Sequence, residues 1–261
     1  MDAPPVLYEV SAPGVARLRL NRPATRNALS VDMLEALIAG FERAGADPEV
    51  RCVVLASGHP TVFSAGADLR GFADGRGLAA KHDDAAAFVR LFRLIGGLSK
   101  PTICAVDGAA LGGAVGVVLA CDLVLAGAEA TFATPELGVG AFPFMVMALL
   151  YRNVPRKRAS EMLLLGERLG AEEAREAGIV NRVLAPAELA GAVEDWAGRL
   201  AAASPVIMRL GKEAMFRQMD MALADALDYL RAQLTIAMST DDLREGMAAF
   251  FARREPEWTG R

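Results

Sequence analysis

Histidine and cysteine are scarce in this sequence, and each shortage excludes a class of chemistry. Among the 261 residues there are two histidines, His59 and His82, and neither lies at metal-ligand spacing from a cysteine. Cys52, Cys104 and Cys121 are odd in number, far apart and set in apolar runs, which predicts buried, reduced thiols. No His-Asp-Ser order suggests a catalytic triad. We therefore expect neither a metal site nor serine-nucleophile chemistry.

Long hydrophobic runs and an excess of positive charge are also absent. The longest uncharged stretches, residues 108–121 and 137–151, are shorter than the roughly 20 residues that a membrane-spanning helix needs. The first residues contain no basic start followed by an apolar segment of signal-peptide length. The net charge is −4 and the two signs are interspersed, which still allows a local basic pocket for a phosphate. These features predict a soluble, cytoplasmic protein that contacts neither nucleic acid nor membrane.

Apolar runs alternate with helical patterns through the first two thirds of the chain. A helix is expected from the N-cap Ser30 to about Ala44, and a buried helix over residues 111–120. The expected strands cover residues 6–10, 15–20, 52–56, 102–106 and 123–126. Strands alternating with helices predict an α/β architecture.

From about Pro186 to Arg254 the pattern is helical throughout, with breaks near Ser204-Pro205 and Thr240. The stretch 208–238 is amphipathic and rich in methionine and leucine. Such a tail either folds over its own domain or clasps neighbouring subunits, and the sequence does not separate these arrangements. We divide the chain into a core, residues 1–195, and a C-terminal helical region, residues 196–261.

Residues 63–70 (FSAGADLR) form the first segment that suits chemistry, because they directly follow a predicted buried strand and a turn. Their small side chains let a ligand approach the backbone, so that main-chain N–H groups become the functional atoms. The alternative is a plain strand-to-helix turn with Asp68 as the helix cap. Taken alone, this segment favours the alternative.

The second segment, residues 106–114 (VDGAALGGA), places a glycine pair before an apolar helical run. The start of a helix offers free N–H groups and the positive end of its dipole, which suit a developing negative oxygen. The segment lacks the Lys-Ser/Thr of a P-loop and the spacing of a dinucleotide fingerprint. Close helix packing through small residues is an equally good interpretation of this segment alone.

The third segment, residues 131–138 (TFATPELG), places Glu136 among apolar residues. Desolvation disfavours a charged carboxylate, which tunes such a glutamate for proton transfer near neutral pH. The alternative is a solvated glutamate at a helix start, and the segment by itself favours it.

Together these segments resemble the enoyl-CoA hydratase/isomerase family, whose members are called crotonases. The resemblance covers nearly the whole chain in order and spacing, so it is specific for the family and less specific for the reaction. The matching motifs are LNRPATRNALS (20–30), FSAGADL (63–69), KPTICAVDGAALGGA with its closing CD (100–122), FATPELGVG (132–140), GAEEAREAGIVNRV (170–183) and EGMAAFFARREPEW (245–258).

The resemblance implies an α/β fold, a crotonase-type spiral of ββα repeats whose C-terminal helices build trimers, often paired into hexamers. The substrate would be an acyl-CoA thioester, with coenzyme A as part of the substrate and no separate cofactor. By motif position, the N–H groups of Ala67 and Gly113 would hold the thioester carbonyl. Arg26 and Arg70 stand where family members contact the coenzyme's phosphates, and an ordinary surface arginine is an equally good interpretation of each. Ala65, Asp68, Gly112, Gly116, Pro143 and Phe144 complete the expected substrate-binding set.

Hydratases of this family resemble one another in using two glutamates, and this sequence carries one of them. Glu136 matches the glutamate of the Pro-Glu motif, but Gly116 stands where the other is expected. Hydration requires a water that is oriented and deprotonated while a proton reaches the α-carbon. A double-bond shift requires one group that moves a proton between two carbons. The glycine therefore favours an isomerase, or an atypical hydratase, over an ordinary hydratase, and a non-catalytic acyl-CoA binder remains a third hypothesis.

A second departure follows Glu136. Many relatives have a glycine-rich run after the proline, whereas Pro143 is followed here by Phe144, Met145, Val146 and Met147. These side chains either fill the acyl end of the pocket or belong to the core, and the core is the better assignment for most of them. Phe144 stands where relatives that isomerise dienes carry an aspartate, which argues against that reaction.

Overall fold

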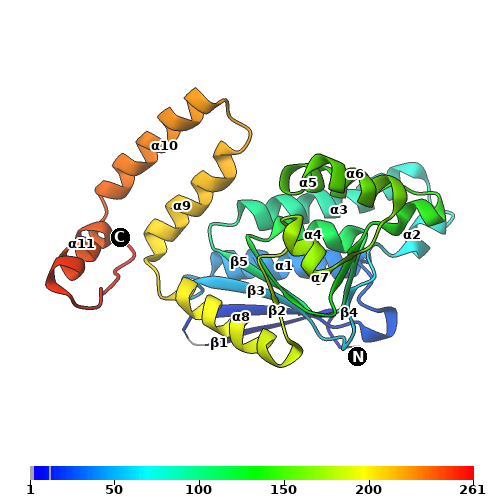
Figure 1. The fold of residues 1–261 in the computed structure, drawn as a ribbon, viewed down its shortest axis with the longest axis horizontal. Helices are drawn as coiled ribbons and strands as arrows, with labels where there is room; N and C mark the ends of the chain where they lie inside the picture. Colours follow the sequence, from blue (N-terminus) through cyan, green and yellow to red (C-terminus); the bar gives the residue numbers. More distant parts are fainter. Residues whose placement is uncertain (1–2, 12) are drawn as a thin grey trace.

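Two sheets of unequal size form the frame of the computed structural model, which describes residues 3–11 and 13–261 (Figure 1). In the larger sheet, of order β1-β2-β3-β5-β7-β10, the first pair is antiparallel and the others are parallel. Its strands are β1 (Val6–Ser11), β2 (Val15–Leu20), β3 (Cys52–Ser57), β5 (Thr102–Val106), β7 (Leu123–Gly127) and β10 (Arg182–Leu184). The smaller sheet contains β4 (Val62–Ser64), β6 (Ala109–Leu111), β8 (Thr131–Ala133) and β9 (Leu169–Gly170), in that order.

The two sheets are built by one repeated unit. The chain runs from β3 to β4, from β5 to β6 and from β7 to β8, each time leaving the larger sheet for the smaller one within a few residues. Helical segments follow each pair: α2 (Leu69–Ala73) and α3 (Leu78–Gly97), then α4 (Gly113–Ala120), then η2 (Pro135–Val139) and α5 (Phe144–Asn153). This succession confirms the predicted α/β spiral of ββα repeats.

Helices cover both faces of the larger sheet. Helix α1 (Val31–Ala46) begins after Ser30, whose hydroxyl accepts a hydrogen bond from the Met33 N–H, as the sequence predicts. Its apolar stripe, including Leu37 and Phe41, joins the main core. Helix α8 (Pro186–Ala201) covers the opposite face, where Leu189 and Val193 pack in a second core. The remaining elements are η1 (Pro23–Thr25), α6 (Arg156–Leu165) and α7 (Ala171–Glu176).

The buried helix after the glycine pair begins later than predicted. The sequence suggested residues 111–120, but Leu111 ends β6 and α4 begins at Gly113. The reason is Gly112, whose φ of 53° and ψ of −124° are not helical and whose N–H donates to the Ala133 carbonyl oxygen at 2.8 Å. Every residue of α4 is buried.

The C-terminal region consists of α9 (Pro205–Gln218), α10 (Leu223–Met238) and α11 (Asp241–Ala252), which extend away from the sheets (Figure 1). The predicted breaks at Ser204 and Thr240 are confirmed, and the structure adds another between α9 and α10. The buried Lys212 fixes α9 to the core, because its ammonium pairs with Asp122 at 2.5 Å. The predicted division at residue 195 falls inside α8 and stays a prediction.

Three further observations concern the described residues as a whole. All three cysteines are buried free thiols. Within residues 3–11 and 13–261, no helix combines the length and apolar character needed to cross a membrane. The same residues contain no cluster of three or more His, Cys, Asp or Glu side chains that could hold a metal ion.

Candidate active site

The two small-residue segments of the sequence lie against each other in the structure. Gly66 has a φ of +85°, and a Cβ added there would stand 2.5 Å from the Leu111 carbonyl oxygen. A Cβ added at Gly113 would stand 3.7 Å from the backbone nitrogen of Ala67. The turn after β4 and the start of α4 therefore share one small volume, and glycine at position 66 permits the close approach.

Two backbone N–H groups at this junction are available to a ligand. Leu29 donates to the Gly66 carbonyl oxygen at 2.8 Å and accepts from Asp68, a pairing that leaves the Ala67 N–H unused. Gly113 is the first residue of α4, so its N–H has no acceptor within the helix. Among the hydrogen bonds of the described residues, neither N–H is a donor. Two convergent N–H groups at the positive end of a helix favour a negatively charged oxygen.

Asn27 holds the turn that carries Ala67, and the sequence analysis missed it. It is fully buried, and its amide nitrogen donates to the Phe63 carbonyl oxygen at 3.1 Å. The backbone carbonyl oxygen of Asn27 accepts from the Ser64 hydroxyl at 2.7 Å, and that hydroxyl accepts from the Gly66 N–H at 3.2 Å. Its φ of +52° suits asparagine better than most residues. Asn27 lies inside a motif quoted for the family resemblance, but only the long-range hydrogen bonds reveal its contribution.

Glu136 points at the same junction from η2. A Cβ added at Gly112 would stand 2.6 Å from Oε1 of Glu136, so the carboxylate lies directly beside the residue before Gly113. The other oxygen, Oε2, is buried and has no hydrogen-bond partner among the described residues. Burial raises the pKa of Glu136, and a hydrogen bond from its own backbone opposes this shift. Burial therefore favours the protonated form of Glu136 more than water would, and Oε2 is free to carry that proton.

The space beside Gly116, where the resemblance places a second glutamate, is filled by an aromatic ring from α3. A Cβ added at Gly116 would stand 2.4 Å from Cζ of Phe92 and 3.0 Å from two further ring carbons. One turn earlier, Phe88 covers Gly113, with Cε1 2.8 Å from an added Cβ. The two rings meet edge-on with centroids 6.0 Å apart. Neither phenylalanine was picked out from the sequence, because a helical stripe of aromatics does not identify what it packs against.

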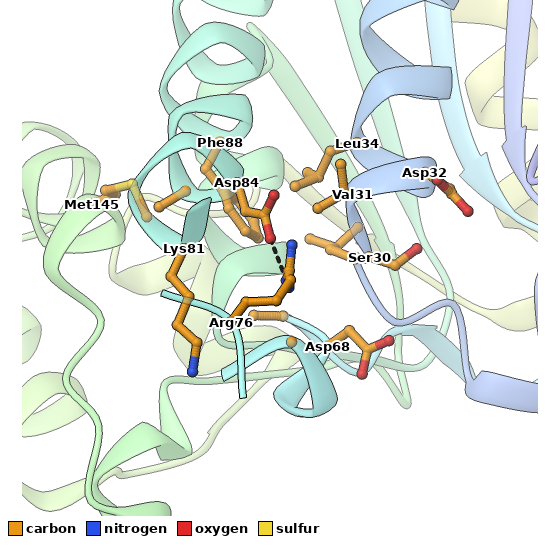
Figure 2. Close-up of a pocket in the computed structure, with 14 residues that line it drawn as sticks. Ser30, Val31, Asp32, Leu34, Asp68, Arg76, Lys81, Asp84, Phe88 and Met145 are labelled. Carbon is orange, nitrogen blue, oxygen red and sulfur yellow. Dashed lines mark ion pairs between the residues drawn. The ribbon is translucent and has the colours of Figure 1, made fainter. Parts of the chain in front are cut away.

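Ala67 also lines a cavity of about 370 Å³. Figure 2 shows the cavity with its lining side chains, among them Leu34, Arg76, Asp84, Phe88 and Met145. Its apolar wall includes Leu34 of α1, Phe88 of α3 and Met145 of α5. Charged side chains, among them Arg76 and Asp84, form another part of the wall. Its size and mixed lining suit a small organic ligand.

The other residues that the sequence singled out lie around this site. The carbonyl oxygen of the exposed Arg26 accepts from the Ala65 N–H at 2.9 Å. The carboxylate of Asp68 accepts from the Arg70 N–H at the start of α2, and it pairs with the Arg70 guanidinium at 2.7 Å. That side chain of Arg70 is 77% exposed.

The segment after Glu136 differs in part from both interpretations given above. Pro143 is the N-cap of α5. Phe144 is 69% exposed and packs against Phe142, so it belongs neither to the core nor to the described lining of the cavity. The next two residues occupy the two predicted environments: Met145 lines the cavity, and Val146 is buried in the core.

Comparisons with known proteins identify the family. The family model described as enoyl-CoA hydratase/isomerase matches residues 11–261. The chain is 36% identical to the 2,3-dehydroadipyl-CoA hydratase of Escherichia coli, over 95% of this chain and 96% of that protein. The crystal structure of an enoyl-CoA hydratase from Mycobacterium smegmatis is 34% identical, with a TM-score of 0.95 over 98% of this chain and 99% of that one. The human enoyl coenzyme A hydratase domain-containing protein 3 is 29% identical, with a TM-score of 0.94 over 97% of this chain and all of that one. The chain therefore belongs to the enoyl-CoA hydratase/isomerase family of enzymes.

Proposed function

We propose that this enzyme is an enoyl-CoA isomerase that moves the double bond of a 3-enoyl-CoA into conjugation with the thioester. One observation carries the proposal: Gly116 stands where the resemblance places a second glutamate, and the Phe92 ring fills the space that such a side chain would need. Glu136 is then the single acid and base, and its unpartnered Oε2 is the atom that takes the proton. The acyl-CoA substrate is the one that the family implies.

The reaction needs one proton and no water. The Glu136 carboxylate removes a proton from C2, the electron pair moves into the thioester, and an enolate forms. The N–H groups of Ala67 and Gly113 hold the enolate oxygen, and each such donor contributes roughly 3 kcal/mol to lowering the barrier. Collapse of the enolate returns the proton from Glu136 to C4, leaving the double bond between C2 and C3. Atoms and charge balance without another reactant.

Coenzyme recognition is part of the same proposal. Arg26 and Arg70 flank the segment that carries Ala67, and both are exposed. We expect them to contact the coenzyme's phosphates, as the family resemblance suggests. Arg70 would have to share its guanidinium between a phosphate and Asp68.

A direct assay tests the proposed reaction. The enzyme is supplied separately with 3-hexenoyl-CoA and with crotonyl-CoA, and conjugation and hydration are followed by absorbance. We expect isomerisation to be the faster reaction by at least tenfold. Hydration at an equal or greater rate contradicts the proposal.

Hydration is the second candidate, because the Escherichia coli relative is named a hydratase. It would need another acid beside the substrate, and Asp84 of α3 lines the cavity. The Asp84 carboxylate is already held by Arg76 at 2.6 Å, so it is poorly placed to take a proton from water. We therefore rank hydration below isomerisation.

The proposal predicts that hydratase chemistry requires two substitutions. Gly116→Glu alone should destabilise the protein and add no hydration, because Phe92 occupies the space where the new side chain must go. Phe92→Ala alone should lower the free energy of unfolding by roughly 3–5 kcal/mol. The double variant should hydrate crotonyl-CoA faster than the wild type, by on the order of 10²-fold. A Gly116→Glu enzyme that hydrates as well as the double variant would show that Phe92 is no barrier.

The tail helices support a trimer or a dimer of trimers. Helices α10 and α11 expose large apolar side chains, with Leu223 76% exposed and Phe250 and Phe251 each 75% exposed. A soluble monomer rarely shows so much apolar surface in one region. We expect light scattering at micromolar concentration to give the mass of three or six chains. Replacing Phe250 and Phe251 with aspartate should yield smaller species. A monomeric wild type contradicts the assembly.

A further inference from the structure

The cavity that Ala67 lines has a charged wall that the proton transfer does not use (Figure 2). There the Arg76 guanidinium lies between two carboxylates, 2.6 Å from Asp84 and 2.7 Å from Asp74. The ammonium of Lys81 lies 3.7 Å from Asp74 and donates to its backbone oxygen at 2.8 Å. Arg76, Lys81 and Asp84 all line the cavity.

Asp84 of the charged wall lies one helical turn from Phe88, which covers Gly113. Asp84, Phe88 and Phe92 are spaced by four residues, so they share one face of α3. Phe92 packs at Gly116 and Phe88 at Gly113, beside the amides. Asp84 is the next position of that stripe, roughly 5–6 Å beyond Phe88. Ala67, Phe88, Asp84 and Arg76 all line the same cavity, so a short acyl chain that entered it from Ala67 and followed α3 past Phe88 would reach the pair of Asp84 and Arg76.

The charges at this wall are already balanced. Arg76 and Lys81 supply two positive charges, and Asp74 and Asp84 supply two negative ones. Asp68 also lines the cavity but is paired with Arg70, whereas Asp32 adds a further carboxylate, so a substrate carboxylate would meet net repulsion. An alkyl end would cover the ion pair without replacing the water that solvates it. A neutral hydroxyl fits, because it can donate to the Asp84 carboxylate and accept from the Arg76 guanidinium.

We propose that the preferred acyl group is short and carries a terminal hydroxyl, which is bound between Arg76 and Asp84. The inference rests on the proposed function, since it assumes that the thioester carbonyl lies at the Ala67 and Gly113 amides. It assigns the substrate class as ω-hydroxyacyl-CoA thioesters and separates this enzyme from relatives that act on acyl groups ending in a carboxylate.

Binding of saturated thioesters tests the proposal without turnover. Hexanoyl-CoA, 6-hydroxyhexanoyl-CoA and adipoyl-CoA share one chain length, and none has a double bond to move or hydrate. By titration calorimetry, we expect the hydroxylated ligand to bind the wild type about tenfold more tightly than hexanoyl-CoA, because it gains hydrogen bonds to charged groups. Adipoyl-CoA should bind no more tightly than hexanoyl-CoA.

Two variants locate the effect. Asp84→Leu should reduce the ratio of the affinities for 6-hydroxyhexanoyl-CoA and hexanoyl-CoA to near one. Asp84→Asn, which keeps the shape of the side chain, should lower this ratio by less. The matched control is Arg90→Leu, which removes another exposed ion pair of α3, with Glu35, outside the cavity. That variant should keep the wild-type preference.

Three results would overturn the proposal. Equal binding of the three ligands by the wild type, or tightest binding of adipoyl-CoA, excludes a hydroxyl-specific wall. Weakening of all ligands and of free coenzyme A by Asp84→Asn shows that the residue contacts the carrier instead. The isomerisation assay is independent of these measurements. A preference for the hydroxylated ligand without isomerase activity refutes only the proposed reaction. Isomerase activity without that preference refutes only the proposed hydroxyl-binding role of Arg76 and Asp84.

Discussion

Glu136→Gln is expected to lower the isomerisation rate by roughly 10²–10⁴-fold while leaving the affinity for hexanoyl-CoA nearly unchanged. Glutamine keeps the size of the side chain and its hydrogen-bonding atoms, but it cannot carry the proton between C2 and C4. Exchange of the C2 proton with deuterated water, followed by NMR, should be abolished in parallel. The control is Glu129→Gln, which removes an exposed carboxylate from the β7–β8 connection.

The pH dependence should report the same carboxylate. Burial raises the pKa of Glu136, and the base must be ionised to act. The wild-type kcat/KM should therefore fall as the pH is lowered through a pKa above the usual glutamate range, and any residual activity of Glu136→Gln should lack this limb. A glutamine variant that retains rapid proton exchange would assign the chemistry to another group.

At neutral pH, Glu136→Gln should make the folded protein more stable although it makes the enzyme less active. Because the folded-state pKa of Glu136 is raised, the folded protein binds this proton more tightly than the unfolded chain. Its contribution to stability is present below the unfolded-state pKa and is lost as the pH rises through the folded-state pKa. Glu136→Gln should therefore melt at a higher temperature than the wild type at neutral pH, and the difference should disappear in acid.

Gly113→Pro is expected to reduce isomerisation by roughly 10²–10³-fold, because it deletes one of the two N–H groups that hold the enolate oxygen. Gly113 is the first residue of α4, a position at which proline is compatible with a helix. The matched control is Gly113→Ala, which keeps the N–H and places a Cβ at the same point, 2.8 Å from the edge of Phe88. The difference between the two variants isolates the N–H from the added bulk.

A spectroscopic readout complements the rate. Hydrogen bonds polarise the thioester carbonyl of bound hexanoyl-CoA and lower its infrared stretching frequency, and Gly113→Pro should move this frequency back toward that of the free ligand. Wild-type turnover in a folded Gly113→Pro enzyme would remove Gly113 from the oxyanion site.

Short-range sequence patterns were sufficient to predict many of the helices and strands. Ser30 caps α1 as expected, and the apolar runs at β3 and β5 form buried central strands. These signals are strong because hydrophobic periodicity and capping act over a few residues. The start of α4 was misplaced because the conformation of Gly112 depends on a hydrogen bond to Ala133, which is distant in sequence.

The sequence by itself determined the family, the α/β spiral, the lone Glu136 and the absence of its partner at Gly116. Each of these depends on which residues are present and in what order. Only the tertiary structure decided what surrounds them: the Phe92 ring at Gly116, the Asn27 hydrogen bonds behind Ala67 and the charged wall at Arg76 and Asp84. The physical reason is that the Phe92 and Asn27 contacts join separate turns of the spiral, and the packing between turns depends on the whole core rather than on any local pattern. The ion pair of Arg76 and Asp84 joins α3 to the loop just before it, and the folded conformation of that loop brings the two charges together.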